Sequence, residues 1–155
     1  MIPSDSSRLF EQSFDTFKVF DNLTVANSSS DQQTFPASIW QILQHLLVWQ
    51  EHQLAQLQGG FLMESFDEKG SWNSGRVPSS EAVLQVAVAK FKQQLVQMHA
   101  HANQEKREIP EVLRQGLILQ DVALHLSFHV GEVVLMRRFQ GSYPLPAHMQ
   151  EFLQA

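Results

Sequence analysis

The chain has 155 residues, with 11 Lys and Arg, 16 Asp and Glu, a formal net charge of -5 and no cysteine. That length suits one domain over residues 1–155, and the missing cysteine excludes disulfides, thiolate metal ligands and a cysteine nucleophile. The few basic residues argue against a nucleic-acid partner. We find no signal peptide and no apolar stretch of transmembrane length, so we expect a cytoplasmic protein without a membrane partner.

Apolar residues recur at helical spacing through most of the chain. The first predicted helix is amphipathic and covers Ser7 to Phe20. The polar, serine-rich segment from Asn22 to Gln33 is predicted to be a loop. A second helix is predicted to begin at Thr34 to Pro36, because proline is tolerated in a first turn, and to stop at Gly59-Gly60. An irregular segment, Phe61 to Pro78, follows.

Ser79 to Glu81 is predicted to cap a third helix that runs from Val83 to about Ala102. The polar stretch Asn103 to Pro110 leads to a fourth helix, from about Leu113 to Phe139, which ends at Gly141. A short terminal helix is predicted to end at Leu153. The predicted fold is all-α, a four-helix bundle with a short C-terminal helix, connected either up and down or with a crossover. The candidate buried residues of the third helix are Val86, Val88, Phe91, Leu95 and Met98.

Two histidines four residues apart mark the fourth predicted helix. Four helical residues advance about 400°, so His125 and His129 share a face on which both rings can reach one divalent ion. Asp121 and Glu132 lie on the same stripe. Gly131 costs a helix about 1 kcal/mol relative to alanine, which suggests room for a ligand or a close helix contact. This group predicts a metal site; the alternative is a pair of solvent-facing or hydrogen-bonded core histidines.

A metal site of this kind needs a further ligand from another helix. The second predicted helix offers His45 and, two turns later at nearly the same angle, His52. His45 lies in an apolar stretch, and a buried imidazole needs partners, which coordination would supply. The alternatives are a hydrogen-bonded core histidine for His45 and a partly exposed helix residue for His52. His99 and His101 are predicted to be surface residues near a helix end.

The segment from His125 to Pro144 resembles the C-terminal signature of the DinB-like family. That signature has two histidines separated by three residues, then any residue, Gly, Gln or Glu, and Ile or Val, followed by an arginine-containing turn, Gly, an aromatic residue and Pro. The segment from Ser38 to Trp49 resembles the first ligand segment of the family, and Trp72 its tryptophan-containing loop. The family comprises bacterial four-helix proteins, including YfiT-like metal hydrolases and low-molecular-weight-thiol transferases. Trp72 either covers a pocket or anchors its loop.

The resemblance implies that His45, His125 and His129 are the ligands of nickel or zinc and that the protein is a homodimer. It also implies a metal-dependent thiol S-transferase or hydrolase with a small-molecule substrate. Any low-molecular-weight thiol would come from outside, because the chain has no cysteine. Glu132, in place of the commoner Gln, or else Asp121 would handle protons. The alternatives are a non-enzymatic metal-binding or stress-related interaction protein and a structural bundle without metal.

Overall fold

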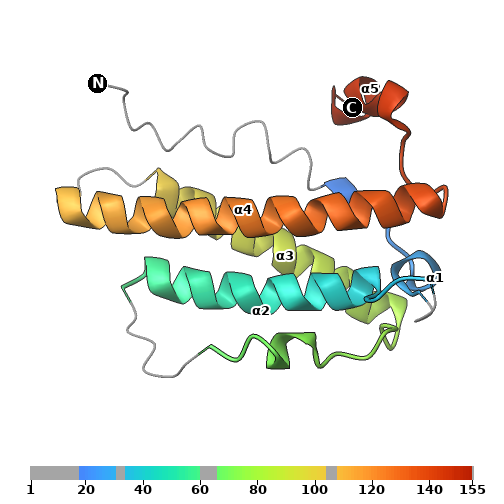
Figure 1. The fold of residues 1–155 in the computed structure, drawn as a ribbon, viewed down its shortest axis with the longest axis horizontal. Helices are drawn as coiled ribbons and strands as arrows, with labels where there is room; N and C mark the ends of the chain where they lie inside the picture. Colours follow the sequence, from blue (N-terminus) through green and yellow to red (C-terminus); the bar gives the residue numbers. More distant parts are fainter. Residues whose placement is uncertain (1–17, 31–33, 60–65, 104–107, 155) are drawn as a thin grey trace.

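The structure is a computed structural model that describes residues 18–30, 34–59, 66–103 and 108–154. Within these ranges the protein is all-helical and has no strand, which confirms the all-α prediction (Figure 1). The elements, in chain order, are α1 (Val25–Ser28), α2 (Ile39–Leu57), the 3-10 helix η3 (Gly70–Trp72), α3 (Glu81–Ala102), α4 (Ile109–Phe139), the 3-10 helix η4 (Pro146–His148) and α5 (Met149–Gln154).

The three long helices are not joined up and down. Figure 1 shows α2 and α3 running in the same direction and α4 running against both. The chain returns between α2 and α3 through the segment that carries η3, which lies along α2 on the side away from α4. Of the two connectivities that the sequence allowed, the described helices therefore follow the one with a crossover. The returning segment brings η3 against the middle of α2.

Helix α2 begins at Ile39 and not at Thr34 to Pro36, so the predicted start is wrong. The Ser38 side chain accepts a hydrogen bond from the Gln41 backbone N–H, and the Gln41 side chain accepts one from the Ser38 backbone N–H. This reciprocal pair satisfies two N–H groups that have no partner within the helix, and so fixes the start at Ser38. The predicted end is confirmed, because Gly59 follows the last turn with a φ of 79°.

Helix α3 is capped by Ser80, whose hydroxyl accepts a hydrogen bond from the Val83 N–H, as predicted. Its predicted core residues are buried except Val86, which is 70% exposed and was assigned wrongly. Helix α4 begins at Ile109, four residues before the predicted start, because Pro110 lies in the first turn, where its missing N–H has no helical acceptor. Its end at Phe139 is confirmed, and Gly141 follows with a φ of 71°.

Three further predictions concern the N-terminal part and the C-terminal end of the chain. The segment from Asn22 to Gln33 contains the short helix α1, so its assignment as a loop is wrong there; Thr24 and Asn27 form a capping box. The predicted helix Ser7 to Phe20 lies outside the described residues up to position 17, and residues 18–20 form a 3-10 turn. The fourth long helix, and with it the four-helix bundle, therefore stays a prediction. The terminal helix is confirmed as α5.

The core lies between the three long helices. Phe20 and Phe91 meet edge to face, with ring centroids 4.7 Å apart, and both are fully buried. Burial of each large apolar side chain contributes about 1.5–3 kcal/mol, so this packing holds α2, α3 and α4 in place. The largest fully buried apolar side chains include Phe20, Ile39, Leu43, Leu46, Leu57, Leu84, Phe91, Met98, Leu119 and Leu126.

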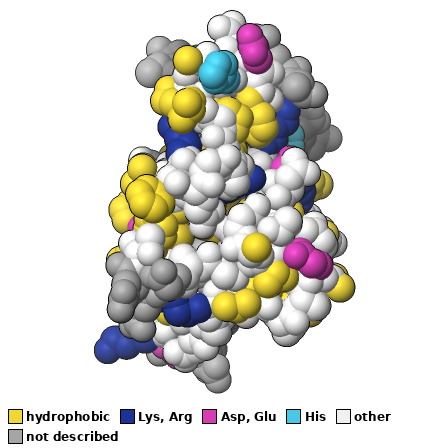
Figure 2. Space-filling view, turned by 90° about the vertical axis from the view of Figure 1, so that its right-hand side faces the viewer, with side chains coloured by type: hydrophobic (Ala, Val, Ile, Leu, Met, Phe, Trp, Pro, Cys, Tyr) yellow, Lys and Arg dark blue, Asp and Glu magenta, His cyan; other side chains and the backbone are white. Residues whose placement is uncertain are grey.

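Helix α4 also carries a row of large apolar side chains, each 64% to 75% exposed, which we call the apolar ridge. Leu113, Leu124 and Leu135 recur every eleven residues, and so do Leu117, Phe128 and Phe139. Eleven residues advance about 20° beyond three turns, so the ridge stays on one side of the helix. Figure 2, which looks at the end of the molecule where α4 finishes, shows several separate apolar patches on this face, with charged side chains next to some of them.

The exposed residues of the apolar ridge add to the apolar character of α4 as a whole. Among the described helices, α4 alone is long and apolar enough to cross a membrane, judged by length and composition only. The prediction that no apolar stretch reaches this length is therefore wrong, because α4 is one continuous helix from Ile109 to Phe139. One third (33%) of its apolar window is buried inside the protein. The core helix of a folded domain passes the same test.

Candidate metal centre

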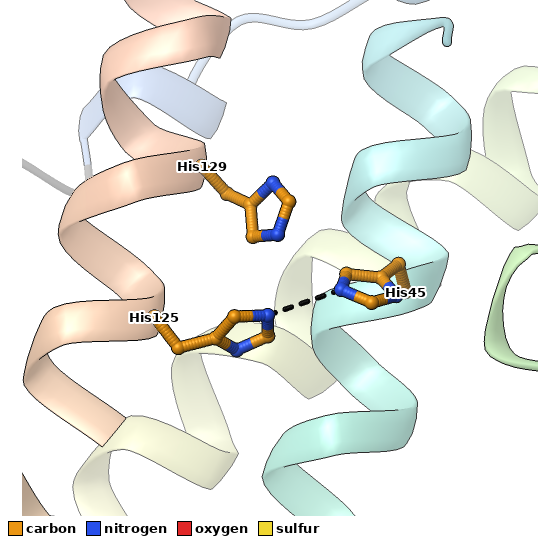
Figure 3. Close-up of side chains that lie close together, drawn as sticks. All are labelled: His45, His125 and His129. Atoms are coloured by element: carbon orange, nitrogen blue, oxygen red, sulfur yellow. Dashed lines mark hydrogen bonds between the residues drawn. The ribbon is translucent and has the colours of Figure 1, made fainter. Parts of the chain in front are cut away.

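Three imidazoles from two facing helices converge at one point. His45 comes from α2, and His125 and His129 come from α4, one turn apart (Figure 3). One ligand atom of each residue lies within 4.8 Å of the others, so the three histidines are close enough to bind one metal ion. The Nε2 atoms of His45 and His125 are 3.0 Å apart. Two nitrogens bound to one ion at about 2.1 Å lie about 3.0 Å apart at a right angle and about 3.4 Å apart in a tetrahedron.

The tautomer of His45 follows from its hydrogen-bond partners. Its Nδ1 lies 2.7 Å from the Ser71 hydroxyl oxygen, and that hydroxyl donates to the carbonyl oxygen of Glu68 at 2.6 Å. A hydroxyl has one proton, so the Ser71 oxygen must accept the hydrogen bond from His45 Nδ1–H. The Nε2 of His45 then keeps its lone pair, and it faces the other two rings. Fixing the tautomer through the outer nitrogen is the usual role of a residue behind a metal-binding histidine.

The 3-10 helix η3 supplies both supports of His45. The Trp72 ring stacks on the His45 ring with centroids 3.9 Å apart and planes 17° apart, next to the Ser71 hydrogen bond. The Gly70 N–H donates to the Asp67 side chain at 2.9 Å, and a Cβ at Gly70 would require that exposed carboxylate to move. Of the two roles considered for Trp72, covering the site is the one observed. Ser71 was missed, and only its position beside Trp72 could have pointed to it.

On the α4 side, Glu132 supports the site. His129 Nδ1 lies 2.7 Å from Glu132 Oε2, and the side chains are 7% and 45% exposed, respectively. Because a carboxylate only accepts, His129 Nδ1 carries a proton, and Nε2 is the nitrogen of this ring that faces the other two histidines. Glu132 thus orients a ring, the same arrangement that Ser71 gives to His45. The sequence offered Glu132 as a proton-handling group, and its second oxygen remains available for that role.

The surroundings keep two of the rings neutral. Burial, together with the charges that His129 and His125 would carry, lowers the pKa of His45 to about 3. Burial and the neighbouring His129 lower the pKa of His125 to about 4. Both imidazoles are therefore neutral near pH 7, which is the form that binds a metal. Because His45 Nε2 carries a lone pair, it accepts the 3.0 Å hydrogen bond from His125 Nε2–H, and an ion bound to both nitrogens would replace this proton, which the neutral His125 ring can carry on Nδ1 instead.

Other residues singled out in the sequence do not join the cluster. Asp121 is exposed, and no hydrogen bond among the described residues links it to an imidazole. His52 lies beside the Phe66 ring, with centroids 4.5 Å apart, and burial lowers its pKa. Gly131 is exposed, and a Cβ there would meet nothing within 4 Å, so no helix packs closely on it, and it does not line the cavity beside the centre. His99 and His101 lie in the last turn of α3, as predicted, but both are half-buried and not exposed on the surface.

A cavity of about 530 Å³ opens beside the centre. His129 and Glu132 belong to its wall, and so does Trp72. The outer part is built from apolar residues of the α2 and α4 helices and of the segment before α2, namely Phe35, Pro36, Ala37, Ile42, Phe128, Leu135 and Met136. The volume lies within the usual range of small-molecule sites. The centre is therefore packed on the His45 side and open on the His129 side.

No protein-family model matches the chain, and no curated protein and no solved structure matches it either. The resemblance to the DinB-like family therefore rests on the motif residues of this chain alone. The proposed activity therefore rests on the geometry and chemistry of the site itself.

Proposed function

We propose that the protein is a divalent-metal enzyme in which His45, His125 and His129 hold one ion. The observation that carries this proposal is the arrangement of their Nε2 atoms. Two of the three rings are held by Ser71 and Glu132 through Nδ1, so that Nε2 is the nitrogen left to bind an ion, and both Nε2 atoms face the cluster. Three histidines with open positions for other ligands are the pattern of catalytic rather than structural zinc sites.

The proposed reaction is either transfer of a thiol to an electrophile or hydrolysis, as the DinB-like resemblance suggests. An ion held by three neutral imidazoles supplies Lewis acidity toward a water, a carbonyl oxygen or a thiolate. Glu132 connects the cavity with the centre, because it lines the cavity and accepts a hydrogen bond from His129. We assign to Glu132 the proton that a thiol or water loses as its sulfur or oxygen attacks the electrophile.

The remaining residues of the centre position these groups. Trp72 lies flat on the His45 ring, so it shields that face from water. Ser71 keeps the His45 ring from rotating. The thiol of a transferase reaction would come from a second substrate, since the chain has no cysteine. We propose nickel or zinc, while three imidazoles accept several divalent ions.

The test begins with protein purified without a metal-affinity tag. We expect about one equivalent of a divalent metal by elemental analysis, before or after loading with nickel or zinc, and its loss in His125→Ala. His52→Ala on α2 is the matched control, because His52 lies outside the cluster, and it should keep the metal. The loaded protein is then assayed with thiols against electrophiles and with esters and amides.

Three outcomes separate the alternatives. Turnover that His125→Ala removes and His52→Ala retains supports the enzyme. A full equivalent of metal without turnover across the panel favours the non-enzymatic metal-binding protein and contradicts the enzyme. No uptake of nickel, zinc or cobalt by the folded protein contradicts both and leaves a structural bundle.

A further inference from the structure

The cavity beside His129 has one polar corner and otherwise apolar walls. Its aromatic side chains are Phe35, Trp72 and Phe128, and its aliphatic ones include Ile42, Leu135 and Met136. All of its lining residues belong to the described part of the chain, and none of them is a lysine or an arginine. The polar residues of the wall are Gln41, His129 and Glu132.

The side-chain amide of Gln41 is not free to bind a ligand at this wall. Its Oε1 accepts the hydrogen bond from Ser38 N–H, and its Nε2 donates to the carbonyl oxygen of Ser74 at 3.1 Å. Both ends of its amide are therefore already bonded within the protein. The groups left to meet a ligand's polar atom are the metal centre at His129 and the carboxylate of Glu132, and these two are joined to each other.

The apolar wall is held in shape before anything binds. Arg76, from the segment between η3 and α3, donates to the carbonyl oxygens of Phe35 at 2.8 Å and Pro36 at 2.9 Å. It also donates to the carbonyl oxygen of Ser30 at 3.1 Å. The Phe35 ring meets the Phe139 ring edge to face, with centroids 5.6 Å apart. A wall fixed in this way binds an apolar group without first having to become ordered.

We infer that the cavity takes the apolar, uncharged body of a small substrate whose single polar group reaches the metal centre. The contact between the polar group of the substrate and the metal rests on the proposed function, whereas the preference for an apolar body rests on the cavity alone. A second anionic group on the substrate would find no countercharge in the wall and would face the Glu132 carboxylate. A highly charged thiol cofactor therefore does not fit this cavity, which instead suits the electrophile of a transferase or the acyl part of a hydrolase substrate.

The first experiment uses the metal-free protein and two fluorescent probes with the same aromatic skeleton. N-phenyl-1-naphthylamine is neutral, and 8-anilinonaphthalene-1-sulfonate carries a sulfonate. We expect the neutral probe to bind at least about 10-fold more tightly, because only the sulfonate has to be desolvated without a partner. Equal or tighter binding of the sulfonated probe would overturn the inference.

Two variants on α4 locate the binding. Leu135 lines the cavity and Leu124 does not, although both belong to the apolar ridge and are 66% and 64% exposed. Leu135→Glu should weaken the neutral probe at least about 10-fold, and Leu124→Glu by no more than about 3-fold. Because both are exposed ridge positions, both variants should fold, and an effect of the ridge as a whole would appear in both. Equal weakening by the two variants would place the probe on the ridge and refute the cavity as its site.

The second experiment uses the zinc-loaded protein with acetohydroxamate and benzohydroxamate, which share one metal-binding group and differ by a ring. Titration calorimetry should give at least about 10-fold tighter binding of benzohydroxamate in the wild type, and Leu135→Glu should lose this preference. Equal binding of the two compounds would show that a metal-bound ligand does not enter the cavity and would overturn the inference. A protein that takes up no metal but still binds the neutral probe would refute the proposed function and leave the apolar preference standing.

Discussion

The two sides of the metal centre are built differently. On the α2 side, His45 is fully enclosed, because Ser71 holds its outer nitrogen and Trp72 covers its face. On the α4 side, His129 is held by a carboxylate whose side chain is 45% exposed and borders the cavity. In the proposed enzyme the α2 side would therefore fix the ion and admit nothing, whereas the α4 side would hold a metal ligand and also contact the substrate. Substitutions on the two sides should consequently have different effects.

The largest effects should come from removing one imidazole on each side. After His45→Ala no charged donor remains on the α2 side, since the Ser71 hydroxyl is neutral. After His129→Ala the Glu132 carboxylate can turn inward and serve as an oxygen ligand. Calorimetry should show that the metal affinity of both variants falls by more than about 100-fold, which is the largest loss expected when a residue that supports a ligand is removed. His129→Ala should stay at least about 10-fold tighter than His45→Ala; the reverse order would contradict the asymmetry.

The supporting residues should come next. Ser71→Ala leaves the buried His45 Nδ1–H without an acceptor, so metal affinity should fall by about 10- to 100-fold. Glu132→Gln keeps an acceptor at a half-exposed position and should cost about 10-fold or less in affinity while lowering turnover. Ser79→Ala, at an exposed serine, is the control and should change neither. If Glu132→Gln weakened the metal more than Ser71→Ala, the α4 side would be the rigid one.

The stability of the metal-free protein should depend on pH through His45. The folded pKa of about 3 lies below the ordinary histidine pKa of 6.5, so between these values the unfolded chain binds a proton that the folded chain does not. This contribution to stability is complete above pH 6.5 and is lost as the pH falls toward 3. Denaturant unfolding should show a loss of about 1–2 kcal/mol from His45 between pH 7 and pH 5. His45→Gln should have a flatter profile; an equal slope would show that the ring is not kept neutral.

The smallest effect concerns a position that faces neither side of the centre. Gly131→Ala should stabilise α4 by about 0.5–1 kcal/mol and leave metal affinity unchanged, because a Cβ there meets open space. Gly116→Ala, also exposed on α4 with nothing within 4 Å, is the matched control. Destabilisation by Gly131→Ala alone, measured by thermal unfolding, would show that something packs on this position.

The two sides of the centre also differ in how far the sequence could predict them. His125 and His129 were predictable because four helical residues return to the same face, and His45 because an imidazole in an apolar stretch needs a partner. Ser71 was not, because its contact with His45 depends on the path that the chain takes back along α2. No local spacing encodes that path. Glu132 follows His129 by three residues on the same helix, and residues at this spacing are neighbours on a helix surface. Their contact could therefore have been predicted from the sequence.

The fold, too, has features that local sequence encodes and features that depend on the packing of the whole chain. The α2 start was readable, because Ser38 and Gln41 have the spacing of a capping box, but Pro36 drew the predicted start three residues too early. The α4 start was missed because Pro110 ended the predicted loop instead of joining the first turn of the helix. The exposure of Val86 depends on which side of α3 meets its neighbours, and this packing is a property of the whole fold.

The central claim is that His45, His125 and His129 share one divalent ion through their Nε2 atoms. Anomalous diffraction from crystals of the protein, purified without an affinity tag and loaded with nickel or zinc, tests it most directly. We predict one peak about 2.0–2.2 Å from all three Nε2 atoms, with the cavity side open to solvent. A peak elsewhere, ligation that leaves out His45, or a fourth protein ligand that closes the cavity side would contradict the account.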